Sequence, residues 1–152
     1  MNETVAIAAM GYLATLSAAG FAAWWRGKSD RQGRILDAKV QVYGECSLSL
    51  YEYERASYNR TKTRLAGSIE DDRQPLREEA YKANTRARSS IGQVAILSGD
   101  EGLAESLSTV RKQIGEYSDA QSTEELTNRH RRALKELDVA LATARRDLTA
   151  NR

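Results

Sequence analysis

The sequence has very little cysteine, histidine and proline, and each shortage excludes a class of protein. Its 152 residues include one cysteine, Cys46, one histidine, His130, and one proline. A single cysteine forms no intramolecular disulfide, and a lone histidine without thiolates makes no zinc site, so we expect no metal and no cofactor. A di-iron bundle is excluded because it needs E-x-x-H pairs on facing helices. Scarce proline and the absence of alternating apolar residues favour a mostly helical chain.

Recognisable catalytic motifs are also missing. The sequence contains no G-x-S-x-G elbow, no P-loop and no G-x-G-x-x-G turn. His130 lies among arginines with no nucleophile beside it. Acidic pairs such as Glu78 and Glu79 lie near expected helix starts, where carboxylates favour the helix dipole. We therefore expect no catalytic residues, no small-molecule substrate and no enzymatic activity.

Acidic and basic residues are nearly equal in number. The chain has 23 basic and 21 acidic residues, and residues 29–152 have 21 and 20, which leaves a net charge of +1 there. Phosphate binding normally leaves a clear basic excess, so we do not expect nucleic acid as the main partner. We interpret the densest basic segment, "NRHRRALK" at 128–135, as an ordinary helix surface.

One uncharged stretch of 22 residues, Thr4–Trp25, stands out from this charged background. As a helix it would be about 33 Å long, close to the roughly 30 Å thickness of a bilayer core. Trp24 and Trp25 suit the interface, and basic residues follow at Arg26, Lys28, Arg31 and Arg34. The positive-inside rule then predicts a single-pass cell-membrane anchor over 1–28, its N-terminus outside, and a cytoplasmic domain over 29–152.

Two other interpretations of this stretch remain open, a cleaved signal peptide and a buried core helix. The small residues of "GFAA" suit a cleavage site, but "MNE" at the start lacks the basic residues of an export signal. A core helix of this length would need a larger protein around it. Small residues recur every four positions, at Gly11, Thr15, Ala19 and Ala23, a spacing that lets membrane helices approach closely. The expected partners are thus the lipid bilayer and either a second protein or another copy of the chain.

Four amphipathic segments follow, and they predict an all-α fold in which the N-terminal transmembrane helix precedes an antiparallel bundle of about four helices. The first segment runs from about Asp30 to Leu65. Its two apolar stripes are Ile35, Leu36, Val42, Tyr43, Cys46, Leu50 and Tyr53, and Leu48, Tyr51, Tyr58 and Leu65. The other three seams are Leu76, Ala80, Ala83, Ala87, Ile91, Val94 and Leu97; Leu103, Leu107, Val110, Ile114 and Tyr117; and Leu126, His130, Ala133, Leu134, Leu137, Leu141, Ala144 and Leu148.

Turn and capping residues mark the boundaries between these segments. Gly67 is expected to end the first helix, Pro75 to lie in the first turn of the second, and Gly99 to close the second. Ser122 and Glu125 form an S-x-x-E capping box at the start of the last.

The segment "RGKSDRQGRILDAKVQVYGE" carries arginines from the alanine-rich stretch into an alanine and tyrosine helix. Over roughly the first 60 residues this arrangement resembles small actinobacterial and actinophage single-span membrane proteins with a cytosolic helical domain. The resemblance implies an architecture and carries over no functional residue. We therefore expect a membrane-anchored interaction, scaffold or regulatory protein without catalysis. The alternative is a holin-like, membrane-perturbing protein that assembles through its small-residue face.

Overall fold

The computed structural model describes the backbone of residues 3–150 and the side chains of residues 31–150. All regular secondary structure in that backbone is helical, which confirms the all-α part of the predicted fold class. Its elements are α1 (Glu3–Leu65), α2 (Glu70–Leu97), α3 (Glu101–Gly115), the 3-10 helix η1 (Glu116–Asp119) and α4 (Thr123–Ala150). The chain divides into two compact units, Met1–Asp37 and Ala38–Arg152.

The first unit consists of helical backbone, and the helix continues through Gly27. The predicted membrane span at Thr4–Trp25 lies outside the side chains that the structure describes. Among the residues that are described, no helix is long and apolar enough to cross a membrane.

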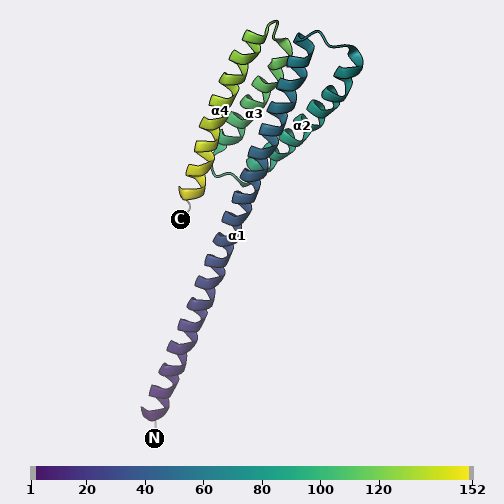
Figure 1. Ribbon diagram of the computed structural model, residues 1–152. Coiled ribbons are helices and arrows are strands. Elements are labelled where there is room, and N and C mark those ends of the chain that lie inside the picture. The colour runs from purple at the N-terminus through teal and green to yellow at the C-terminus, as the bar shows by residue number, and fades with distance from the viewer. Residues whose placement is uncertain (1–2, 151–152) are drawn as a thin grey trace. The chain divides into compact units, whose positions relative to one another are not determined.

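The second unit is an antiparallel four-helix bundle of residues 38–65 and helices α2 to α4 (Figure 1). Contacts between helices give their directions. Lys39 meets Asp147 late in α4, whereas Glu54 meets His130 early in α4. The same reversal relates α1 to α2, through the pairs Ser49 with Ser90 and Glu52 with Arg86. Both neighbours of α1 therefore run antiparallel to it, as the short links predicted.

The predicted seams of the last three helices form the core together with the buried face of α1, which contributes Tyr43, Cys46, Leu50, Tyr53 and Ala56. Every apolar position of the α3 seam is at most 2% exposed, and this set is Leu103, Leu107, Val110, Ile114 and Tyr117. In α2 the buried seam is mostly alanine, namely Ala80, Ala83 and Ala87, followed by Ile91 and Val94. Small side chains let neighbouring helices pack at short interaxial distances, so the alanine-rich α2 fits closely beside α1 and α3.

The expectation that both apolar stripes of α1 are buried is only partly correct: in the second stripe Tyr58 and Leu65 pack against the core, but the other two residues do not. Leu48 is 61% exposed and Tyr51 is 41% exposed, and Ile35 of the first stripe is 54% exposed. At 100° per residue, Leu48 lies about 160° around the helix from Leu50, which is fully buried. The bundle covers only the Leu50 face of α1, so Leu48 and Tyr51 remain on the surface.

The first turn has the predicted glycine terminus. Gly67 has φ +77°, the left-handed conformation that glycine adopts without steric cost. Its N–H donates to the Arg64 carbonyl at 3.1 Å, and the Ser68 N–H donates to the Thr63 carbonyl at 3.5 Å. These two bonds make a Schellman motif, which satisfies carbonyls at the end of α1.

Two other boundary predictions need correction. Helix α2 begins at Glu70, so Pro75 lies in its second turn and the acidic residues before Pro75 are already helical. The same helix ends at Leu97 with an extended Ser98, and Gly99 does not take a left-handed conformation. At Gly99 a Cβ would instead make a tight contact, 3.1 Å from the Asp147 carboxylate, which would have to shift slightly.

Candidate functional site

The structure places two of the predicted site residues. Arg31 and Arg34 of the expected lipid-headgroup flank are exposed on α1. The remaining predicted positions lie outside the described side chains, and they are Gly11, Thr15, Ala19, Ala23, Trp24, Trp25, Arg26 and Lys28. The features described next all belong to the bundle, Ala38–Arg152.

A buried ion pair joins the first and last helices of the bundle. Lys39 Nζ donates to Asp147 Oδ2 at 2.9 Å, and the two side chains are only 6% and 8% exposed. The Tyr43 hydroxyl donates a short hydrogen bond to the same carboxylate oxygen. The Gly99 N–H, from the turn between α2 and α3, also donates to Asp147. One carboxylate therefore ties together α1, α4 and the intervening turn.

This environment shifts the pKa values of both acidic groups. Burial, and then the hydrogen bond to Asp147, together raise the pKa of Tyr43 to about 12. Burial alone would raise the pKa of Asp147, but the hydrogen bonds from Tyr43 and Lys39 and the Lys39 charge lower it below its usual value. At neutral pH Asp147 is therefore an ionised carboxylate, paired with Lys39, and Tyr43 is a neutral phenol.

A second polar cluster lies about three turns further along α1 than Tyr43. His130 Nδ1 is 2.6 Å from Glu54 Oε1, and the Glu54 side chain is 9% exposed. The rings of Tyr58 and Tyr117 lie beside the imidazole, with centroids 4.8 Å and 6.4 Å from it. His130, predicted at the rim of the α4 seam, is half-buried and anchored to α1 through Glu54. Burial, and then the Glu54 charge, raise the pKa of Tyr117.

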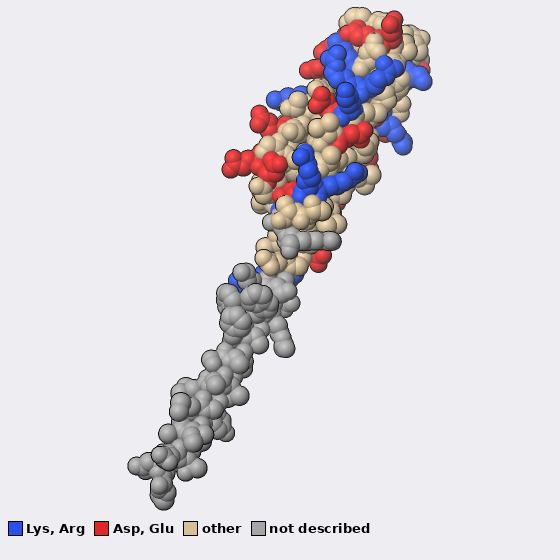
Figure 2. All heavy atoms as spheres, turned by 90° about the vertical axis from the view of Figure 1, so that its left-hand side faces the viewer, with Lys and Arg blue, Asp and Glu red and all other residues tan. Residues whose placement is uncertain are grey.

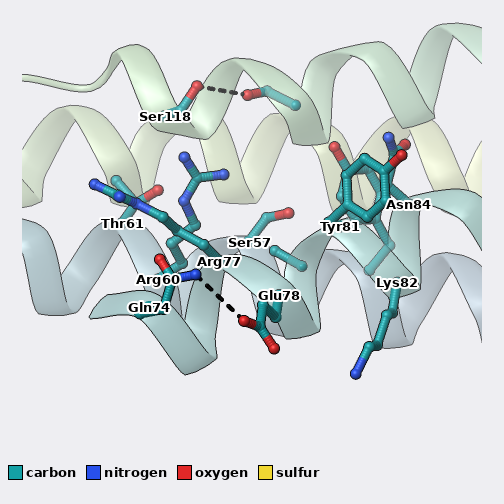
Figure 3. Close-up of a pocket in the computed structure, with 13 residues that line it drawn as sticks. Ser57, Arg60, Thr61, Gln74, Arg77, Glu78, Tyr81, Lys82, Asn84 and Ser118 are labelled. Carbon is teal, nitrogen blue, oxygen red and sulfur yellow. Dashed lines mark hydrogen bonds between the residues drawn. The ribbon is translucent and has the colours of Figure 1, made fainter. Parts of the chain in front are cut away.

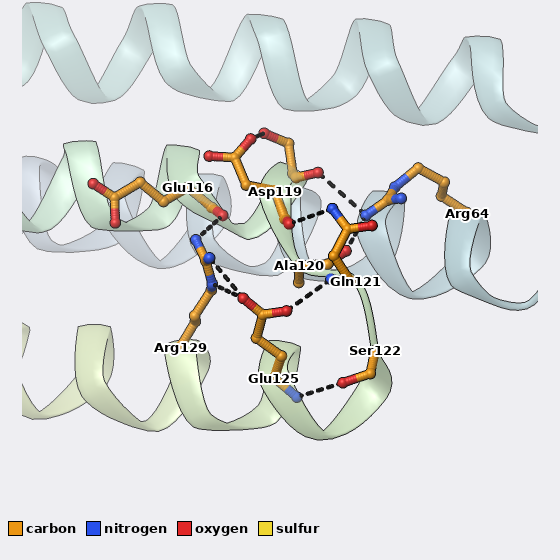
Figure 4. Close-up of polar contacts among 9 residues, drawn as sticks. Arg64, Glu116, Asp119, Ala120, Gln121, Ser122, Glu125 and Arg129 are labelled. Atoms are coloured by element: carbon orange, nitrogen blue, oxygen red, sulfur yellow. Dashed lines mark hydrogen bonds and ion pairs between the residues drawn. The ribbon is translucent and has the colours of Figure 1, made fainter.

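The start of α4 is held by a polar network around η1 (Figure 4). The Glu125 N–H donates to Ser122 Oγ at 3.1 Å, which confirms that half of the predicted capping box. The Glu125 carboxylate accepts from the Gln121 N–H at 2.8 Å, one residue earlier than the box predicts. Arg129 also donates to this carboxylate, at 2.7 Å. The bonds from Gln121 and Arg129 lower the pKa of Glu125.

The outward faces of α1 and α2 enclose a shallow groove of about 420 Å³. Leu48 and Tyr51 form its apolar part, together with the buried Ala83. Charged side chains of both signs surround them, namely Glu52, Arg55, Glu79, Lys82 and Arg86. An apolar centre within a charged rim is the usual composition of a protein interface. We call this surface, lined by residues 48–55 and 79–86, the α1–α2 groove.

A larger cavity of about 530 Å³ opens between α1, α2 and the η1 end of α3 (Figure 3). Arg60, Thr61, Gln74 and Arg77 lie at one end of it, and Tyr81 and Asn84 lie at the other. Sequence reasoning missed this cavity because its lining comes from positions that are far apart along the chain. Among residues 31–150, no three His, Cys, Asp or Glu side chains gather as metal ligands there or elsewhere.

The surface charge of the bundle is mixed rather than divided into zones. Figure 2 shows basic and acidic side chains interspersed over the face that it presents. Several of them form exposed ion pairs, for example Arg86 with Glu52 at 3.4 Å. The bundle therefore has buried polar contacts between its helices, the α1–α2 groove and a cavity lined partly by arginines.

The fold of residues 38–150 is that of a small antiparallel helical bundle. Residues 40–148 match the family model described as KilB plasmid transfer protein. The match covers most of the chain and nearly the whole bundle, so the chain belongs to the KilB plasmid transfer protein family. Comparison with curated proteins and with solved structures gives no match. These comparisons support neither the resemblance to actinobacterial and actinophage membrane proteins nor the holin-like alternative.

Proposed function

We propose that this chain is a non-catalytic interaction protein of plasmid transfer, held at the cell membrane by its N-terminal segment and binding a protein partner through its bundle. The α1–α2 groove carries the proposal, because it exposes Leu48 and Tyr51 within a charged rim. Large apolar side chains that remain exposed together are typical of binding surfaces. The family match supports the process, plasmid transfer.

The proposed occupant of the groove is an amphipathic helix of the partner. The groove lies between two antiparallel helices, so a third helix fits along it with its apolar face on Leu48 and Tyr51. The rim carries both signs, with Glu52 and Arg55 on α1 and Glu79 and Arg86 on α2. A helix with acidic and basic residues flanking its apolar face complements such a rim.

Membrane attachment rests on the sequence of the N-terminal segment. The stretch Thr4–Trp25 is uncharged, and the first charges after it are basic. Each basic side chain next to anionic lipid contributes on the order of 1 kcal/mol to binding. The proposed orientation therefore has the N-terminus outside and the bundle in the cytoplasm.

The first prediction concerns this attachment. C-terminally tagged protein should fractionate with membranes, its tag should resist protease added outside intact cells, and the intact mass should include residues 1–25. Loss of about the first 22 residues from the mass would instead indicate a cleaved export signal and contradict the cytoplasmic orientation.

The second prediction concerns the α1–α2 groove. Leu48→Glu should lower plasmid transfer at least about tenfold, because a charge would replace an apolar contact at the centre of the interface. Val139→Glu is the matched control, since Val139 is 57% exposed on α4 and lies outside the groove. Transfer is measured by mating, and the amount of folded protein by circular dichroism of each purified variant. Equal transfer by the two variants would refute a role for the groove.

A further inference from the structure

Four arginines converge where α1 ends, α2 begins and η1 passes by. Arg60 and Arg64 come from the last turns of α1, and Arg73 and Arg77 from the first turns of α2. Together with Thr61 and Ser118 they line a small cavity of about 70 Å³. Arg60, Thr61, Arg77 and Ser118 also line the larger cavity of about 530 Å³, so the two spaces adjoin.

The positive charge of this cluster exceeds the negative charge that balances it. Arg60 has no hydrogen bond or ion pair in the described part of the chain. Arg64 donates only to neutral acceptors, the carbonyls of Ser118 and Ala120. Glu70 alone pairs with the α2 arginines, at 3.8 Å from Arg73 and closer to Arg77. One carboxylate thus serves four guanidinium groups.

Part of the cluster is also buried without a partner. Arg73 Nε is shielded from solvent and has no hydrogen-bond partner, although its terminal nitrogens contact Glu70 and the Ser68 carbonyl. A buried N–H without an acceptor is unfavourable, so this guanidinium group retains an unused donor. The side chain of Thr61, which is 2% exposed, lies against the same space.

We propose that this arginine cavity binds the phosphate group of a small organic phosphate, with the organic part in the adjoining larger cavity. Guanidinium forks match phosphate oxygens in geometry and charge. The volume of about 530 Å³ lies in the range of small-molecule pockets. Tyr53 and Tyr81 offer aromatic surface, and Asn84 offers an amide, to a planar group such as a nucleoside base.

A small ligand fits this site better than a nucleic-acid strand. The arginines surround a recess instead of following an extended track, and the bundle outside it carries acidic and basic residues in nearly equal number. Strand binding depends on a basic groove that tracks the backbone. Glu70, whose side chain is 61% exposed and pairs with Arg73 and Arg77, acts as the counter-ion that the phosphate displaces.

Isothermal titration calorimetry on the full chain in neutral detergent tests the proposal, with pyrophosphate and ADP as probes at fixed ionic strength. Arg60→Gln should weaken binding of both about tenfold, because one charge-assisted hydrogen bond is lost. Glu70→Gln should tighten both about threefold, because the competing carboxylate is removed. ADP should bind more tightly than pyrophosphate, and Tyr81→Ala should remove that advantage.

Arg88→Gln is the matched control, because Arg88 is an exposed arginine of α2, the helix that carries Arg73 and Arg77, and it lines neither cavity. It should bind both probes as the unchanged protein does. Equal affinity of Arg60→Gln and Arg88→Gln would overturn the proposal, as would the absence of binding by the unchanged protein. Binding of a short single-stranded oligodeoxynucleotide in place of ADP, with the same dependence on Arg60, would overturn it in favour of a nucleic-acid site.

Discussion

Asp147→Asn should lower the free energy of unfolding by about 3 kcal/mol, because it leaves the buried Lys39 ammonium without its counter-ion. The substitution preserves the shape of the side chain, so the loss of unfolding free energy measures the effect of removing the charge. Chemical denaturation of the full chain in mild detergent, followed by circular dichroism, measures the change. Glu52→Gln is the control, since its ion pair with Arg86 is exposed and should contribute less than about 1 kcal/mol.

The effect of Asp147→Asn should also depend on pH in a definite direction. The folded-state pKa of Asp147 lies below its unfolded value, so its contribution to stability is complete above about pH 4. It is lost as the pH falls through the lower, folded value, where the unchanged protein also holds a neutral side chain. The difference between the two proteins should therefore shrink in acid. Adding Lys39→Met to Asp147→Asn should restore stability at neutral pH, and failure to do so would show that the buried charge is not the cause.

Tyr117→Ala should cost about 3–5 kcal/mol of unfolding free energy, the usual loss when a large buried aromatic ring is truncated. Tyr117 is fully buried in η1, where it packs beside His130 of α4. Its removal leaves a cavity at the point where α3 turns toward α4. The same denaturation experiment measures the loss.

Tyr117→Phe separates the ring from its hydroxyl. In the described structure that hydroxyl is buried and makes no hydrogen bond of normal geometry, and the Glu54 carboxylate near it raises its pKa, so its removal should change stability by less than about 1 kcal/mol. A loss in Tyr117→Phe as large as that in Tyr117→Ala would show that the hydroxyl, and not the packing of the ring, holds η1 in place.

The sequence predicted the bundle well wherever apolar residues recur at helical spacing with small polar links. The α3 seam from Leu103 to Ile114 is fully buried, and Gly67 ends α1 as expected. Periodicity worked there because each of these helices has one apolar stripe. It failed on α1, where Leu48 and Leu50 lie on nearly opposite faces and periodicity alone cannot say which face the other helices cover.

The sites were harder to predict because their residues are polar and come together only in three dimensions. Lys39 and Glu54 lie on the buried face of α1 at the same spacing as Tyr43 and Leu50, but charged residues are usually counted as surface. The partner of Lys39 lies 108 residues further along the chain, and the partner of Glu54 lies 76 residues further along. The arginine cavity likewise depends on the turn at Gly67, which brings Arg60 and Arg77 to one space. Only the antiparallel register of the helices reveals these pairings.

The contact between Lys39 and Asp147 determines how the bundle is tethered. Because these residues meet, the chain enters and leaves the bundle at the same end. Arg60 lies about 32 Å further along α1, at the opposite end. A label or fusion partner at the C-terminus, like whatever precedes residue 38, is thus attached at the end away from the arginine cavity. Both covalent connections of the bundle are therefore at one end of it, and a tag attached at either of them is joined at a distance from Arg60.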